Sequence, residues 1–328
     1  MQYFAYAKKV DGLKTFDTKK DDNHRKQGST GPSIGRLGKY LLKFIHNSNL
    51  NVCYANKINN YEDRLSNYLS KNKMTRNISL NSCVLFSKDM DFNKFKAFKD
   101  RVSILDWEET YIKQGFVLFY SNGFALKDKI MTTNNGGMLK YTKNLKFING
   151  VVSRSVKLNK NSTYLVLSSF VFLGKNFAQI ESSFVIPVYS KEFPIPYESM
   201  NEKYVLEKIF DIVEALNEKN IRDIKISKPV LDIKINDSFC RPDFILSING
   251  KKIIVEVKGY NDEEYNIRKE RAHKVMNKIG DFIEIDATEF SDKNERYRRL
   301  NEFENNILNR FIESKDKTIQ RLNEFVII

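Results

Sequence analysis

Histidine and cysteine are scarce in this chain of 328 residues, and their scarcity excludes several kinds of site. The three histidines are too few for a histidine-rich metal centre and leave few partners for a Ser-His or Cys-His pair. The three cysteines, Cys53, Cys83 and Cys240, are odd in number and show no C-x-x-C spacing. We therefore expect reduced thiols rather than a disulfide framework or a zinc site. A catalytic site in this chain must rely on carboxylates and lysine.

Long apolar runs are also missing. No stretch approaches the roughly 18 apolar residues of a membrane-spanning helix. The first residues lack the basic-then-apolar pattern of a secretory signal peptide. These absences predict a cytoplasmic protein that makes no contact with a membrane.

Basic residues are in excess. The chain has 55 lysine and arginine residues against 41 aspartate and glutamate residues, a formal charge of +14, and its pI is near 9.4. A positive balance of this size favours a polyanionic partner, of which nucleic acid is the commonest. A lysine- and asparagine-rich background composition is the alternative explanation.

Proline is rare but clustered: Pro187, Pro194 and Pro196 are three of only six in the chain. Such a cluster is typical of a linker, so we predict an N-terminal domain over 1–190 and a second domain over 191–328. The first shows helical periodicity before residue 103 and strand-like runs from 116 to 188. It is expected to be a mixed α/β or β-rich domain, with nucleic-acid or partner recognition as its possible roles.

The most informative stretch is 241–258, which reads as two apolar strands joined by Asn249 and Gly250. Asn-Gly between apolar runs is the strongest short-range signal for a two-residue type I′ hairpin. In that register Ile248 pairs with Lys251, and Asp243 lies opposite Glu256.

This register brings two carboxylates together, because directly opposed residues share a face with Cβ atoms about 5 Å apart. Lys258, two residues after Glu256, points to the same face. Two such close anions repel unless a cation or proton lies between them. Hard oxygen ligands at this spacing suit Mg²⁺, with Mn²⁺ as a substitute. The alternative is a surface ladder in which Lys258 only pairs with Glu256.

A helix is predicted from Ser199 onward, where Ser199 and Glu202 form a capping-box pattern. Glu202 begins the apolar stripe that continues through Val205 and Leu206, whereas Glu207 shares a charged face with Lys203. Glu202 is therefore the acid expected to face the hairpin, unless its side chain serves only the cap.

Further elements complete an α-β-β-β-α-β order: a strand at 230–235, the hairpin, a helix over 262–279 and a strand at 282–287. A last amphipathic helix is predicted over 295–313. The 262–279 helix carries a run of basic side chains, Arg268, Lys269, Arg271 and Lys274. Arg268, Arg271 and Lys274 follow one another at i, i+3 spacing and share a side, whereas Lys269 lies off that row. A solvated basic face is the alternative reading.

This order, with Glu202 on the first helix, Pro242-Asp243 on one strand and Glu256-Val257-Lys258 on the next, resembles the PD-(D/E)XK nuclease superfamily. Lys228-Pro229 and the sequence from Arg241 to Phe244 are similar to transposon- and plasmid-borne endonucleases of that group. The resemblance covers about residues 198–290. It implies a restriction-endonuclease-like core, a mixed sheet flanked by helices.

The resemblance also implies an activity, that of a Mg²⁺-dependent endonuclease that hydrolyses phosphodiester bonds, with DNA as the expected substrate. Asp243 and Glu256 would bind the metal with the backbone carbonyl of Val257, and Glu202 would hold a second metal or a metal-bound water. Lys258 would orient or deprotonate the attacking water. The basic residues of the 262–279 helix would grip phosphates.

Two alternatives stay open at this point. One is a catalytically inactive nuclease fold that binds nucleic acid. The other is an adaptor subunit of a mobile-element or defence complex, in which residues 1–190 bind other protein subunits.

Overall fold

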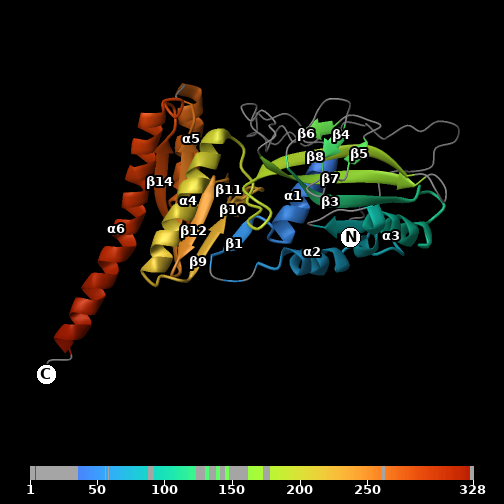
Figure 1. Cartoon of the computed structure of the whole chain (residues 1–328). Coiled ribbons are helices and arrows are strands. Elements are labelled where there is room, and N and C mark those ends of the chain that lie inside the picture. Colours follow the sequence, from blue (N-terminus) through green and yellow to red (C-terminus); the bar gives the residue numbers. More distant parts are fainter. Residues whose placement is uncertain are drawn as a thin grey trace. The chain divides into compact units, whose positions relative to one another are not determined.

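The computed structural model describes residues 4, 36–55, 57, 59–87, 92–122, 130–132, 138–140, 145–147, 162–172, 178–260 and 263–325. It separates into two compact units (Figure 1). Unit 1 is Met1–Asn51 with Asn60–Glu198, and unit 2 is Val52–Asn59 with Ser199–Ile328. The structural division thus falls at Glu198 and Ser199, and it adds a short N-terminal segment to unit 2 that the sequence did not suggest.

Unit 1 is a mixed α/β structure whose elements are α1 (Arg36–Asn47), α2 (Tyr61–Ser70), η1 (Leu80–Cys83), β2 (Val84–Ser87), α3 (Phe92–Ser103), β3 (Gln114–Asn122), β4 (Ile130–Thr132), β5 (Met138–Lys140), β6 (Leu145–Phe147), β7 (Thr163–Phe172) and β8 (Ala178–Val188). The larger sheet has the order β2-β3-β7-β8-β6, and β4 and β5 form a separate pair. The larger sheet is mixed, because β2–β3 and β6–β8 are parallel while the central pairs are antiparallel.

The long strand β3 separates two helical layers of unit 1. Phe116 contacts Tyr40 and Phe44 of α1 edge-on. Its neighbour Val117 belongs instead to the core cluster that contains Phe98 of α3. Successive side chains of a strand point to opposite faces, so α1 and α3 cover opposite faces of this sheet.

Unit 2 contains β1 (Val52–Tyr54), α4 (Met200–Glu218), β9 (Ile224–Ser227), β10 (Ile233–Ile235), β11 (Ser238–Cys240), β12 (Phe244–Ile248), β13 (Lys251–Lys258), α5 (Glu263–Met276), β14 (Asp281–Asp286) and α6 (Lys293–Phe325). Its main sheet has the order β1-β9-β12-β13-β14. The β13–β14 pair is parallel and the other pairs are antiparallel, so this sheet is also mixed.

The predicted α-β-β-β-α-β order is present as α4, β9, β12, β13, α5 and β14. The strand predicted at 230–235 was wrong as a member of this sheet. The sheet strand is β9, four residues in which buried Ile224 and Ile226 alternate with half-buried neighbours. Pro229 lies just beyond it and has no N–H to donate to a ladder. Residues 233–235 pair with β11 in a separate two-stranded sheet.

The edge strand β1 comes from the N-terminal part of the chain. Its Val52 pairs with Ser227, and Tyr54 pairs with Lys225. A three-residue strand has no usable sequence period, and its partner lies more than 170 residues away, so local patterns could not reveal it.

The hairpin of β12 and β13 lies inside the sheet of unit 2 because both strands have neighbours on each side. On one face, Ile254 packs with Val275 and Met276 of α5 and with Cys240 of β11. Helix α4 contacts β13, α6 contacts β14, and the two helices contact each other. This packing holds the end of β13 beside α5 and near the start of α4, where the predicted site residues lie.

Cys53, Cys83 and Cys240 are buried and form no disulfide. None of the helices in the described part of the chain has both the length and the apolar character that crossing a membrane requires.

Candidate active site

The turn between β12 and β13 has the conformation that the sequence predicts. Asn249 has φ of 48° and Gly250 has φ of 80°, and a type I′ turn needs positive φ at both positions. Ile248 pairs with Lys251, and Phe244 pairs with Val255. The predicted register is therefore confirmed, and it brings Asp243, just before β12, to the level of Glu256.

Glu256 lies in the middle of the sheet and is completely buried. A buried carboxylate is stable only when it is paired or binds a cation. Lys269 of α5 forms an ion pair with its Oε1 atom. The Oε2 atom accepts no hydrogen bond from any described residue, so one buried oxygen of this carboxyl group is left without a donor.

Asp243 is held by two donors. The Val257 N–H donates to its Oδ2 atom at 2.8 Å, and the Lys228 ammonium lies 3.2 Å from its Oδ1 atom. Burial alone would raise the pKa of this carboxyl. The charges of Lys228 and Lys269, together with the Val257 N–H, outweigh burial and hold the pKa of Asp243 below its ordinary value. Asp243 is therefore an anion at neutral pH.

Glu202 reaches the same place from the first turn of α4. The Ser199 hydroxyl accepts a hydrogen bond from the Glu202 N–H at 3.1 Å and caps the helix. The Glu202 side chain lies 2.8 Å from Lys228 Nζ and is buried. Glu207 instead pairs with Lys203, and its side chain is 43% exposed. The predicted choice of Glu202 as the acid facing the hairpin is confirmed.

Lys228 links the two acids and is the residue that sequence reasoning missed. Its side chain is 2% exposed, and its ammonium lies between Glu202 and Asp243. In the sequence, Lys228-Pro229 stood out only as a detail of the resemblance. A stronger signal was present, because Ile224, Ile226 and Lys228 alternate with period two. That spacing places Lys228 on the buried side of the strand's path.

Lys258 ends β13 and is half-buried. Its partner on β14 is Asp286. Among the described residues, no hydrogen bond or ion pair of the Lys258 ammonium is present. The hydrogen bond from Thr288 Oγ1 to Asp286, 2.6 Å long, lowers the pKa of Asp286, and the charges of Arg299 and Lys258 add to this. Lys258 thus lies beside an ionised carboxylate at the end of the sheet, on the face that carries Glu256.

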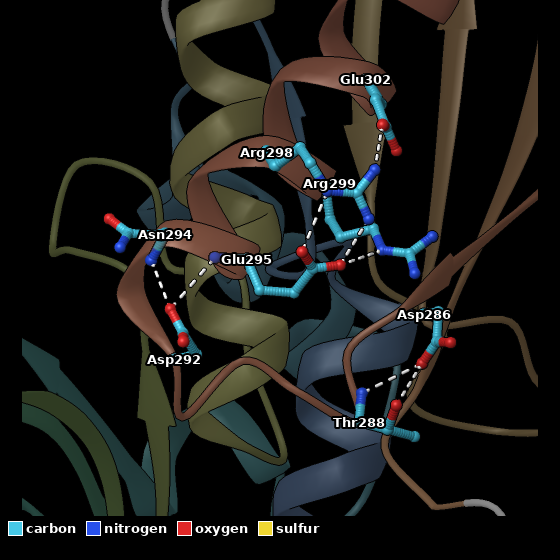
Figure 2. A network of polar contacts seen from close by, with 8 residues as sticks. All are labelled: Asp286, Thr288, Asp292, Asn294, Glu295, Arg298, Arg299 and Glu302. Carbon is cyan, nitrogen blue, oxygen red and sulfur yellow. Dashed lines mark hydrogen bonds and ion pairs between the residues drawn. The ribbon is translucent and has the colours of Figure 1, made fainter.

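Figure 2 shows the polar contacts that follow Asp286 along the chain. The Asp292 carboxylate accepts hydrogen bonds from the N–H groups of Asn294 and Glu295, at 2.7 and 3.2 Å, and caps α6. Glu295 then binds Arg298 and Arg299 of the next turn. These contacts fix the start of α6 after β14, and so support the strand end where Asp286 adjoins Lys258.

The basic residues of α5 divide into two groups. Arg271 and Lys274 are exposed, as the predicted phosphate-binding row requires. Lys269 is turned toward Glu256 instead, which agrees with its position off that row. The side chain of Arg268 lies outside the described residues. Binding of phosphate by these four residues stays a prediction.

The donor set can be tested against Mg²⁺ chemistry. Within the described ranges, no three Asp, Glu, His or Cys side chains approach closely enough to form a metal cluster. Mg²⁺ does not need such a cluster, because it is usually held by one or two carboxylates together with water and substrate phosphates. Ionised Asp243 and the open Oε2 atom of buried Glu256 satisfy that requirement. These residues fit a Mg²⁺ site.

Comparison with known proteins agrees with this geometry. Residues 198–324 match the model of a restriction endonuclease-like C-terminal domain. The match covers most of unit 2 and includes every predicted site residue. Unit 2 therefore has a restriction-endonuclease-like fold, which is consistent with the PD-(D/E)XK resemblance.

The N-terminal part identifies the family. Residues 2–169, more than half of the chain, match a family described as domain of unknown function DUF8535. The protein belongs to that family. A curated relative, the "Uncharacterized protein in cib 5'region" of Escherichia coli, is 27% identical over 104 residues. That match covers 29% of this chain and 48% of the relative, so the chain spans about half the length of the curated relative it matches.

Proposed function

We propose that the protein is a metal-dependent endonuclease that hydrolyses phosphodiester bonds in DNA. The observation that carries this proposal is the pair of carboxylates, half-buried Asp243 and fully buried Glu256, at the confirmed hairpin register within a restriction endonuclease-like domain. Burying a charged carboxylate costs free energy. Ionisable groups in such perturbed surroundings cluster at functional sites.

In the proposed mechanism Asp243 and Glu256 would hold Mg²⁺ together with the carbonyl of Val257. When bound there, the ion supplies positive charge for the scissile phosphate and acidifies a water molecule. The Val257 N–H and Lys228 keep Asp243 ionised and fixed in direction. Lys258, on the same face two residues beyond Glu256, orients the attacking water and offsets negative charge that develops on the phosphate.

The choice of DNA as substrate rests on charge. Unit 1 has 30 lysine and arginine residues against 16 aspartate and glutamate residues, whereas unit 2 has 25 of each. The whole +14 excess therefore belongs to unit 1. Unit 1 supplies the general attraction for the polyanion, and exposed Arg271 and Lys274 on α5 bind phosphates next to the site.

Nicking of supercoiled plasmid by the full chain, with Mg²⁺ or with EDTA, tests the proposed function. We expect nicked and linear DNA with Mg²⁺ or Mn²⁺ and intact plasmid with EDTA. Equal nicking under both conditions would show that the carboxylate site does not perform the reaction.

A second candidate has one observation in its favour. The buried acids are already balanced by protein ammonium groups, Lys228 and Lys269, as they would be in a nuclease fold that binds nucleic acid without cutting it. Such a protein could be an adaptor subunit in a mobile-element or defence complex. Plasmid that binds but is never nicked, together with protein partners that survive nuclease treatment in a pulldown, would favour this alternative.

A further inference from the structure

We infer that the site takes one divalent cation, at Asp243 and Glu256, and that Lys228 is a fixed cation in the place that a second ion would need. This inference rests on the proposed function. It assigns Lys228 the role of a positioning residue, and it replaces the expectation that Glu202 holds a second metal.

The position of the Lys228 ammonium is the first argument. It lies 2.8 Å from Glu202 Oε2 and 3.2 Å from Asp243 Oδ1, and it is 5.3 Å from the centre of the Phe244 ring. The side chain is 2% exposed, and those of Glu202 and Asp243 are 9% and 15% exposed. An ion bridging these two carboxylates would have to occupy the same volume as this buried ammonium.

The contrast with Lys269 is the second argument. Lys269 pairs with Glu256 from α5, and its side chain is 27% exposed. A long side chain with a partly exposed stem can turn its ammonium into water at little cost. Lys228 has no comparable exposure. If its ammonium moved away from Glu202, one of these two charges would be left unpaired in the interior. A divalent cation arriving at Glu256 therefore displaces Lys269 and leaves Lys228 in place.

Charge balance is the third argument. Glu202, Asp243 and Glu256 carry three negative charges, and Lys228 with one divalent cation neutralises all three. A second divalent cation beside Lys228 would leave a net charge of +2 among buried groups, which the low dielectric of the interior opposes. Lys258, half-buried at the end of β13, then remains as the positive charge available to the substrate phosphate.

The number of bound ions tests the inference without any cleavage. The full chain is titrated with Mn²⁺ in the absence of DNA, and bound ion is counted by calorimetry and by electron paramagnetic resonance. We expect one Mn²⁺ per chain. Glu202→Gln should also bind one, because Glu202 faces Lys228 rather than the ion, whereas Glu256→Gln should lose the site. Two ions per wild-type chain, or the loss of an ion in Glu202→Gln, would overturn the inference.

The two lysines provide a matched pair of variants. Lys269→Met should still bind one ion and bind it roughly tenfold more tightly, a normal size for coupling between competing ligands. Lys228→Met should bind a second ion, and Mn²⁺ should raise its Tm more than it raises the wild-type Tm. A Lys228→Met chain that folds, binds one ion and gains no extra stability from Mn²⁺ would contradict the assigned role. If this variant does not fold, the numbers of Mn²⁺ ions bound by the wild type and by Glu202→Gln still test the inference.

The outcomes separate this inference from the proposed function. Two ions per chain with Mg²⁺-dependent nicking would refute the single-ion site and leave the nuclease intact. A wild-type chain that binds no ion and nicks no DNA would refute the nuclease and the single-ion site together.

Discussion

The two units of this protein use charge in opposite ways. In the described part of unit 1 the buried polar side chains are all neutral, and the unit's excess positive charge is at the surface or on residues outside the described ranges. Unit 2 has no net charge, yet it buries Glu202, Lys228 and Glu256. Surface charge attracts a polyanion at long range, whereas buried charge is costly and is retained for chemistry. Under the proposed function, unit 1 would attract the DNA and unit 2 would cleave it.

Lys258→Ala gives the largest expected effect among changes that leave the metal ligands intact. Removing the group proposed to orient the attacking water should lower the cleavage rate by roughly 10²–10⁴-fold. DNA affinity should stay the same, because the proposed function assigns most of the attraction to unit 1. Single-turnover cleavage and fluorescence anisotropy on the same preparations measure the two properties. A variant that loses affinity but cleaves normally would reverse the assignment of the units.

Glu202 and Glu207 form a matched pair on one helix. Glu202→Ala leaves Lys228 with a partner missing in a buried site, and should lower the free energy of unfolding by roughly 2 kcal/mol. Glu207→Ala removes an exposed pair with Lys203 and should cost under about 1 kcal/mol. Urea unfolding measures both values. Cleavage should fall only in Glu202→Ala, and the reverse pattern would show that the wrong acid was chosen.

Arg271→Ala with Lys274→Ala tests how far unit 2 contributes to binding. If both side chains neutralise phosphates, the slope of log affinity against log salt should flatten by about two units, at roughly 0.9 per contact. The loss of affinity should be similar for unrelated DNA sequences, because phosphate contacts carry no base information.

The matched control for this double variant lies in unit 1, where Lys39 and Lys96 are exposed. Replacing both with Gln removes the same amount of charge from the other unit. A slope that changes only in the unit 1 variant would identify Arg271 and Lys274 as a solvated face.

The smallest predicted effect concerns Glu295. Hydrogen bonds from Arg298 and Arg299 lower its pKa from 4.5 to about 2. Because the folded-state pKa lies below the unfolded value, the contribution to stability is complete above about pH 4.5 and disappears as the pH falls toward 2. The Tm of Glu295→Gln should therefore lie slightly below that of the wild type at pH 7 and equal it near pH 2. A Tm difference that does not change with pH would mean that the Glu295 charge contributes nothing.

Local patterns were sufficient for the parts of the site that depend on short-range geometry. The Asn249-Gly250 turn fixed the register, and the 3.6-residue period separated Glu202 from Glu207. The parts that were missed depend on long-range contacts. Strand β1 pairs with a segment far away in the sequence. Lys269 reaches Glu256 through the packing of α5, which no spacing within the helix reveals.

Lys228 is an intermediate case. Its alternation with Ile224 and Ile226 was visible in the sequence, but the strand was predicted after Pro229 instead of before it. The error in one strand therefore hid the residue that connects Glu202 and Asp243.

The most direct test of the central claim is the single-turnover cleavage rate of Glu256→Gln at saturating DNA and fixed Mg²⁺. Saturation removes the contribution of unit 1 from the rate, so that only the carboxylate site is compared. Loss of a ligand worth several kcal/mol should reduce the rate by roughly 10³-fold or more, while the DNA concentration at half-saturation stays at the wild-type value. An unchanged rate would contradict the account, because the buried carboxylate of Glu256 would then have no part in the reaction.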